Sequence, residues 1–352
     1  MKKLLALVLA VFMIAMVAGC STPAPAPTAT EAPAATEAPA AATEAPKPAD
    51  EKFTIATVVK LTGVAWFDRM EEGVKKFAAD TGMDAFQTGH STADPAEQVR
   101  IIDDLIAQGV DAICVVPNST ESLEAVLKKA MDAGIVVIAH EASNIQNANF
   151  DIEAFDNIEY GKHFMGMLGE MMGGKGQYTT FVGSLTATSH NEWVDGSTQV
   201  QSEKYPDMEL VSNKNESTEN IDNAYSKTLE LLKAYPNLVG FQGSAMTDVV
   251  GVGKAIDEMG KQDSTVVIGT SLVSVSGQYL ETGAIDKISF WDPAEAGYAM
   301  NELALKILKG EVPADGVSLQ ATGYQNLKLV DKVFYGSAWI DVDKTNMGNY
   351  NF

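Results

Sequence analysis

The chain has 352 residues, of which 46% are hydrophobic and 20% charged, and its formal net charge is −22. An acidic excess of this size argues against binding to nucleic acid and against electrostatic docking on an anionic lipid surface. The hydrophobic content is typical of a globular protein, and roughly 300 residues beyond the N-terminal region suffice for two domains of ordinary size.

Residues 1–19 have the pattern of a lipoprotein signal peptide. Two lysines precede an apolar stretch that ends in VAGC at positions 17–20, and this order of charged, apolar and small residues is typical of a secretory signal. VAGC resembles a bacterial lipobox, in which the chain is cleaved after Gly19 and Cys20 is lipidated; a chance cysteine in an ordinary signal peptide is the alternative. We therefore expect Cys20 to anchor the chain to the cell membrane, on its extracytoplasmic face, without a spanning helix.

Residues 20–50 are dominated by proline, alanine and glutamate, and the unit TEAPA recurs in them. Such a segment cannot bury apolar surface, and its prolines favour extended conformations. We interpret it as a disordered tether that holds a folded body away from the membrane; glycosylation of its threonines is an alternative. A lipobox followed by such a tether suggests a Gram-positive cell surface.

The remaining chain alternates short apolar runs with helical patterns. Strands are predicted at 53–60, 111–117, 135–141, 177–184, 208–213, 238–243, 264–271 and 285–291. Helices are predicted at 71–82, 94–110, 119–134, 189–206, 219–236, 249–260, 277–283 and 295–310. The helix at 94–110 shows the signals well, with Asp94 as N-cap, Pro95 in the first helical position and Gly109 at its end.

Continuous apolar strands between helices predict parallel sheets that are covered on both faces. The pattern restarts near residue 155, so the predicted fold class is α/β with two doubly wound parallel-sheet lobes of similar size. Cys114 lies in one of these apolar strands, where we expect a small buried hydrophobic residue.

In open parallel sheets the ligand binds at the carboxyl ends of the strands. The residues that follow the predicted strands are polar hydrogen-bonding groups and aromatic rings, which suit the hydroxyl groups and C–H faces of a polyol. These residues are Lys60, Trp66, Phe67, Asn118, His140, Glu141, Ser143, 184–191 with Ser189 and His190, Ser244, Ala245, Met246, Thr247, Thr270, Ser271, Trp291 and Asp292.

Four segments carry a resemblance to a known family: KLTGVAWF at 60–67, SHNEWVDG at 189–196, SFWDPAEAG at 289–297 and MGNYNF at 347–352. With them the chain from about residue 53 to its end resembles the type I periplasmic binding proteins that serve ABC importers of simple sugars. Within these it is most similar to autoinducer-2 receptors of the Lsr type, with rhamnose-binding proteins next.

The resemblance implies two lobes joined by crossover strands, which close over one ligand in the cleft between them. It places residues 51–154 and about 293–323 in the first lobe, and residues 155–292 and about 324–352 in the second. It also implies a membrane-embedded ABC permease as the partner, a monomeric chain and no cofactor.

The family's ligand contacts fall on five places in this sequence. Its pocket lysine matches Lys60, and its first-lobe aspartate falls on Glu141, which keeps the carboxylate. Its second-lobe Asp-Gln pair falls on Ser189 and His190, and two backbone contacts fall on Ser244 and Met246, so these positions depart from the pattern. The resemblance therefore implies autoinducer-2 in its cyclic tetrahydroxylated form as the ligand, with a monosaccharide such as rhamnose or a pentose as the alternative.

Some assignments have alternatives that the residues themselves leave open. We expect one ring of Trp66 and Phe67 to line the cleft and the other to pack inward, although both could be core. Asp292 could contact ligand or cap the following helix. Ser189 and His190 are sequence neighbours whose side chains diverge at a helix start, which disfavours a catalytic dyad.

Two other classes of function share some of these features. Sugar-responsive repressors have the same fold, but the signal peptide and the lack of an N-terminal helix-turn-helix pattern disfavour a transcription factor. An extracellular enzyme is disfavoured because the sequence has no metal-ligand cluster, phosphate-binding loop or triad spacing. We therefore predict a binding protein rather than an enzyme.

Overall fold

A computed structural model describes residues 52–352 of the chain. The predicted signal peptide, the lipidation site at Cys20 and the tether at 20–50 lie outside the described residues. Within residues 52–352, no helix combines the length and the apolar character needed to cross a membrane.

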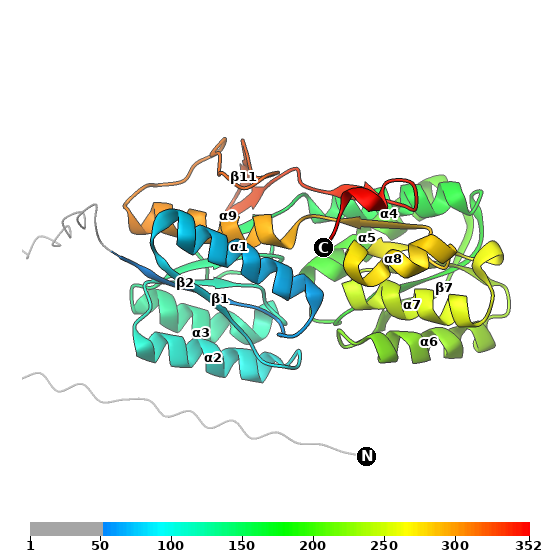
Figure 1. The fold of residues 1–352 in the computed structure, drawn as a ribbon, viewed down its shortest axis with the longest axis horizontal. Helices are drawn as coiled ribbons and strands as arrows, with labels where there is room; N and C mark the ends of the chain where they lie inside the picture. Colours follow the sequence, from blue (N-terminus) through cyan, green and yellow to red (C-terminus); the bar gives the residue numbers. More distant parts are fainter. Residues whose placement is uncertain (1–51) are drawn as a thin grey trace, which may run out of the picture. The chain divides into compact units, whose positions relative to one another are not determined.

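The first of two sheets has the strand order β11-β12-β5-β4-β3-β1-β2. Its strands are β1 (Thr54–Val58), β2 (Asp84–Thr88), β3 (Ala112–Val115), β4 (Val136–Ala139), β5 (Phe150–Glu153), β11 (Lys328–Val330) and β12 (Val333–Tyr335). All neighbours pair in parallel except β11, which forms an antiparallel edge on β12. Helices α1 (Ala65–Thr81) and α9 (Pro293–Leu308) cover one face, and α2 (Pro95–Gln108) and α3 (Thr120–Asp132) cover the other (Figure 1).

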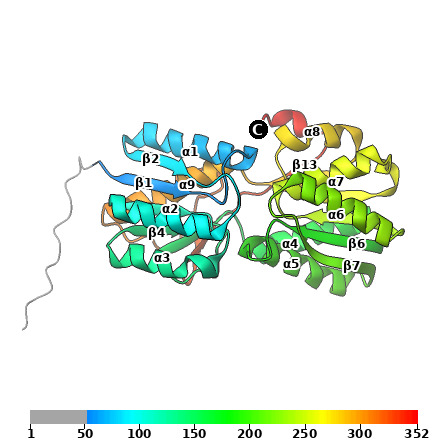
Figure 2. The same cartoon turned by 90° about the horizontal axis from the view of Figure 1, so that it is seen from below.

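The second sheet has the strand order β13-β10-β9-β8-β6-β7. Its strands are β6 (Lys175–Val182), β7 (Asp207–Glu216), β8 (Leu238–Gly243), β9 (Val266–Thr270), β10 (Lys287–Phe290) and β13 (Ile340–Val342), of which only β13 runs antiparallel to its neighbour. Helices α4 (Asn157–Met171) and α5 (Thr188–Lys204) cover one face, and α6 (Ile221–Ala234) and α7 (Met246–Glu258) cover the other (Figure 2). Helix α8 (Val273–Thr282) packs beside α7.

The two sheets confirm the predicted class: α/β, with two doubly wound parallel lobes joined by crossover segments. The chain passes between the lobes three times, at 154–156, at 291–292 and at 336–339. Helix α9 returns to the first lobe, where it packs on α1, β3 and β4.

The last crossover lies later in the chain than we expected. Residues 328–335 belong to the first lobe, whereas the sequence placed everything from about residue 324 in the second. The reason is packing: β12 pairs with β5, and the buried Phe334 ring contacts Phe150 with ring centroids 4.9 Å apart. Strands of three residues, as β11 and β12 are, give only a weak strand signal in a sequence.

Local signals explain several element boundaries. The Asp94 carboxylate accepts the backbone N–H groups of Ala96 (2.8 Å) and Glu97 (3.4 Å), which confirms it as the N-cap of α2. Gly109 ends that helix with a φ of 72°, a left-handed conformation that glycine adopts without strain. Cys114 is fully buried in β3, as predicted.

Candidate ligand-binding pocket

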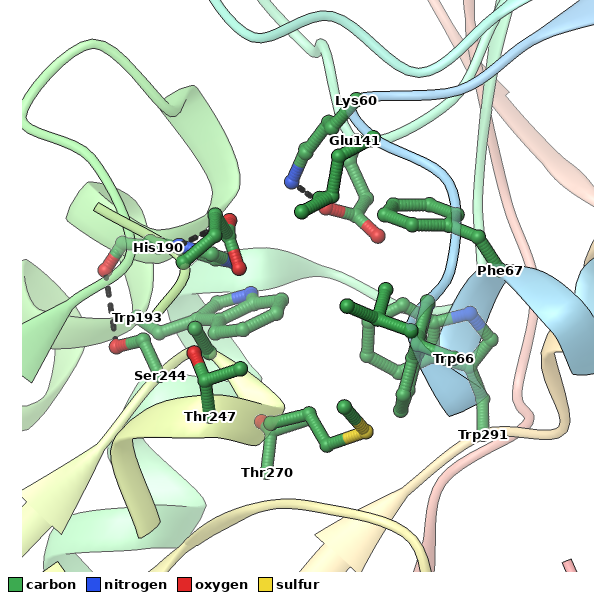
Figure 3. Close-up of a pocket in the computed structure, with 15 residues that line it drawn as sticks. Lys60, Trp66, Phe67, Glu141, His190, Trp193, Ser244, Thr247, Thr270 and Trp291 are labelled. Carbon is green, nitrogen blue, oxygen red and sulfur yellow. Dashed lines mark hydrogen bonds and ion pairs between the residues drawn. The ribbon is translucent and has the colours of Figure 1, made fainter. Parts of the chain in front are cut away.

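A narrow hollow, partly open to solvent, lies between the carboxyl ends of the two sheets (Figure 3). Most of the residues that the sequence singled out line it: Lys60, Trp66, Phe67, Glu141, His190, Ser244, Met246 and Trp291. Asn118, Ser189 and Asp292 do not line it. The lining also contains Trp193 and Glu219, which the sequence analysis missed.

A buried ion pair occupies the first-lobe side of the hollow. Lys60 follows β1 and Glu141 follows β4, so the order of the strands brings them together, and Nζ lies 2.6 Å from Oε2 (Figure 3). Both side chains are only 4% exposed. A buried charge needs such a partner, because desolvation is otherwise too costly.

The ion pair keeps both groups charged. Burial alone would lower the pKa of Lys60, but the carboxylates of Glu141 and Glu219 outweigh it and the pKa is raised. Burial also opposes the charge of Glu141, yet the Lys60 ammonium holds the pKa of this carboxyl lowered to about 2. Glu141 has a φ of 58°, a strained conformation for a residue with a side chain, which aims the carboxylate into the hollow.

His190 is a neutral imidazole on the second-lobe side. Its Nδ1 accepts the N–H of Gly183 at 3.2 Å, so the ring proton is on Nε2. Burial, followed by the charge of Lys60, lowers the pKa of His190 to about 3. The Ser189 hydroxyl donates to Glu141 at 3.2 Å and not to His190, so the geometry provides no nucleophile–base pair.

Aromatic rings form the wall of the hollow. Trp66 and Trp291 meet edge to face with centroids 4.7 Å apart, and Trp193 packs against Trp291 at 5.8 Å. The expectation that only one of Trp66 and Phe67 would face the cleft is wrong, because both line it. Helix α1 begins at Ala65, six residues before the predicted start, and its first turn therefore presents both rings.

Asn118 supports the pocket from behind. Its Nδ2 donates to the backbone carbonyl of Lys60 at 2.9 Å, and its own N–H donates to Oε1 of the buried Gln98 at 2.8 Å. These bonds fix the loop that carries Lys60. The Asn118 side chain therefore holds the backbone of Lys60 and does not line the hollow.

Asp292 caps the N-terminus of α9, which was the alternative to ligand contact. Its Oδ1 accepts the N–H of Ala294 at 2.9 Å at the start of α9, and its carboxylate pairs with Arg69 at 2.6 and 2.9 Å. The bidentate Arg69 pair joins α1 to the second crossover segment, outside the hollow.

Hydrogen bonds join the two lobes around the hollow. Besides Ser189 to Glu141, they run from Ser143 to Glu192 (2.7 Å), from Thr188 to Asn144 (2.9 Å) and from Thr186 to the Asn118 carbonyl (2.9 Å). The described conformation therefore has its lobes in contact at the mouth of the hollow. Within residues 52–352, no group of His, Cys, Asp and Glu side chains is arranged to hold a metal ion.

Two doubly wound lobes, three crossovers and a polar, aromatic-walled hollow between the lobes define a two-lobed binding protein of type I. A model of the periplasmic binding protein domain matches residues 55–312. The chain therefore belongs to the periplasmic binding protein family, which confirms the expectation of a binding protein rather than an enzyme.

A curated relative agrees with this membership. The D-ribose/D-allose-binding protein of Pseudomonas aeruginosa is 26% identical over 288 residues, which cover 76% of this chain and 86% of that protein. Two solved structures share the fold. An ABC transporter solute-binding protein of Clostridium phytofermentans with bound L-rhamnose has a TM-score of 0.79 and 20% identity, with 85% of this chain and 98% of that chain covered. LsrB of Clostridium saccharobutylicum in complex with AI-2 has a TM-score of 0.78 and 21% identity, with 85% and 100% covered.

Proposed function

We propose that this chain is the substrate-binding lipoprotein of an ABC importer and captures one small polyhydroxylated ligand in the hollow between its lobes. The observation that carries the proposal is the buried pair of Lys60 and Glu141, which faces a hollow walled by tryptophan rings. The ammonium donates to ligand oxygens, the carboxylate accepts from adjacent hydroxyls, and the rings pack against C–H faces.

We further propose autoinducer-2, in its cyclic tetrahydroxyfuran form, as the ligand. The proposal is supported by the resemblance at Lys60 and Glu141, both of which line the hollow, and by the fold shared with the AI-2 complex. A monosaccharide is the second candidate, because Ser189 and His190 depart from the receptor pattern. The D-ribose/D-allose-binding relative and the structure with bound L-rhamnose favour a pentose or a deoxyhexose in that case.

Lobe closure delivers the ligand to its partner. Ligand contacts on both sides of the hollow stabilise the closed arrangement by differential affinity, and the closed form is presented to a membrane permease. We propose that the protein acts as a monomer held at the extracytoplasmic face through lipid on Cys20. Fractionation of cells that express the chain or a Cys20→Ala variant tests the anchor, since equal membrane association of the two would contradict it.

The ligand can be identified by expressing the protein in cells that contain candidate ligands and analysing what it has bound. Residues 21–352 would be expressed in a host that makes autoinducer-2 and in a host that cannot, and bound compounds would be released by heating. The release would be tested with an autoinducer-2 reporter and by mass spectrometry. Reporter activity from the producing host alone supports the receptor, whereas a released pentose or deoxyhexose supports the second candidate. An empty protein that also binds neither in calorimetry contradicts the proposed function.

A further inference from the structure

Glu219 places a second, largely buried carboxylate in the hollow, beside the one that Lys60 pairs with. It lies in the loop between β7 and α6, lines the hollow and has a side chain that is 11% exposed. Its Oε1 lies 4.0 Å from Nδ1 of His190. That nitrogen already accepts the Gly183 N–H, so both atoms are acceptors and no hydrogen bond joins them.

The backbone holds this carboxylate in place at a cost in strain. Thr218 and Glu219 have φ values of 56° and 53°, two consecutive left-handed conformations in residues that carry side chains. The loop is fixed by the Glu219 N–H, which donates to the Gly183 carbonyl at 3.2 Å, and by Asn223, which donates to Thr218 Oγ1 at 2.7 Å. Strain of this kind is typical of a functional position.

Gly183 makes the space that Glu219 uses. A Cβ atom added at position 183 would collide with the Glu219 carboxylate. Gly183 has no positive φ that would require glycine for the backbone itself. The absence of a side chain at position 183 therefore serves to admit the carboxylate.

The hollow holds one carboxyl group more than its single lysine can neutralise. Lys60 is paired with Glu141, and the His190 imidazole is neutral, so Glu219 is a carboxyl group beyond the one that the lysine neutralises. Burial raises the pKa of Glu219, and the charge of Lys60 opposes this shift. A ligand that brings hydroxyl donors satisfies Glu219, whereas one that brings a negative charge adds to the excess.

We propose that Glu219 contacts the ligand and sets its specificity: it accepts hydrogen bonds from ligand hydroxyls on the second-lobe side, opposite Glu141, and excludes sugars that carry a carboxylate or phosphate. The inference rests on the proposed function, namely the binding of a small polyhydroxylated molecule. It adds the residue that determines which members of that class enter.

Calorimetry on the mature chain tests this assignment with two variants, each of which alters the Glu219 carboxylate in a different way. Glu219→Gln keeps the shape and removes the carboxylate, and Gly183→Ala leaves the carboxylate but displaces it. Asp222→Asn, on the exposed first turn of α6, is the control for the same change of charge. The neutral probes are autoinducer-2, L-rhamnose and D-ribose, and the anionic probes are D-galacturonate and D-ribose 5-phosphate. Thermal unfolding of each variant establishes that it is folded.

The wild type should bind at least one neutral probe and neither anionic probe. Glu219→Gln and Gly183→Ala should lower the affinity for the neutral probe at least about tenfold. Glu219→Gln should also reduce the difference in affinity between the neutral and the anionic probes. Asp222→Asn should leave all of these affinities unchanged. Wild-type affinity in the folded Glu219→Gln variant overturns the assignment and leaves the proposed function standing. A wild type that binds no neutral probe, or prefers an anionic one, overturns both.

Discussion

Lys60 and Glu141 are two charged side chains whose burial would each be strongly unfavourable without the other. Each is buried to 4% exposure, and each keeps its charge because the other is 2.6 Å away. A ligand that enters the hollow meets one donor group and one acceptor group whose positions are already fixed. Preorganisation of this kind reduces the entropy lost on binding.

We expect Glu141→Gln to weaken ligand binding at least tenfold, about 1.4 kcal/mol, because the ligand loses a charged acceptor and Lys60 loses its partner. Isothermal calorimetry with the ligand identified from the producing host measures the change. Glu121→Gln, exposed in the first turn of α3, is the matched control. An unchanged affinity would remove Glu141 from the set of ligand contacts.

The sequence correctly placed in the hollow the polar residues that stand one or two positions after a strand, while their contacts with a ligand stay a prediction. Lys60, Glu141 and Ser244 are such residues, and the carboxyl ends of parallel strands meet at the hollow. Trp193 was missed because it lies within α5, although it follows His190 by three positions and therefore shares its helix face. Glu219 was missed because the sequence placed it at the first position of a helix, whereas α6 begins at Ile221 behind the cap Asn220.

At the scale of elements, the junction of β5, α4 and α5 concentrates buried carboxyl groups beside the first crossover. Asp151 and Glu153 lie on β5 and Glu192 on α5, and Asn157 donates to both glutamates at 3.0 and 2.9 Å. Burial raises the pKa of Asp151 to about 7 and the pKa of Glu153 well above its usual value, where Asp151 adds to the shift. β5 therefore retains acidic residues in a position that favours their protonated forms.

A raised pKa makes the folded state lose stability as the pH rises from about 4, where an unfolded aspartate titrates, to about 7, where the buried Asp151 does. We expect Asp151→Asn to raise the melting temperature by several degrees at pH 8 and by less at pH 5. Thermal unfolding at the two pH values measures this difference. Asp104→Asn, exposed on α2, should change the melting temperature by the same small amount at pH 5 and at pH 8. An equal rise in melting temperature for Asp151→Asn at the two pH values would contradict the raised pKa of Asp151.

Helices α4 and α5 pack closely through glycines, of which Gly161 lies against the backbone of Trp193. A Cβ atom at Gly161 of α4 would collide with the backbone carbonyl of Trp193 in α5, and Ser197 Oγ donates to the Gly161 carbonyl at 2.7 Å across the same contact. The contact thus positions the ring of Trp193 in the hollow.

We expect Gly161→Ala to destabilise the protein by about 3 kcal/mol, because a backbone collision cannot be relieved by a rotamer change. Gly166→Ala on the same helix meets no atom within 4 Å and should be neutral or stabilise by up to about 1 kcal/mol. Chemical denaturation of both variants compares them directly. A similar loss of unfolding free energy at positions 161 and 166 would show that α4 does not tolerate alanine for glycine at either place, and that the contact with α5 is not the cause.

For the whole molecule, the contacts between the lobes determine how readily the hollow closes. The bond from Ser143 to Glu192, at 2.7 Å, joins residues of different lobes, and neither residue lines the hollow. Its energy is therefore available only when the lobes are together, so it contributes to the differential stability of the closed form.

We expect Ser143→Ala to weaken ligand affinity about 3- to 10-fold, since one half-buried hydrogen bond contributes about 1 kcal/mol. Calorimetry measures the affinity, and small-angle scattering with and without ligand follows closure. Ser202→Ala, exposed near the end of α5, is the control. Equal affinities of the two variants would show that this bond forms equally in the open and closed arrangements.

The architecture of the whole was predictable from the alternation of apolar runs and helical patterns, and five of its short strands were not. The sequence missed β2, β5, β11, β12 and β13. β2 has the sequence DAFQT with no fully buried residue, and β5 is FDIE with two acidic residues among four. Such strands are specified by their neighbours in the sheet rather than by their own composition.

The three crossovers also govern the order in which the protein can fold. The first lobe needs β1 near residue 54, α9 after residue 293 and β12 at residue 333, and a bond between Asn301 and Thr57 spans 244 positions of sequence. Contacts this far apart give a high contact order and slow folding. A nascent chain that emerges from the ribosome therefore cannot complete its first lobe until β12, close to the C-terminus, has been synthesised.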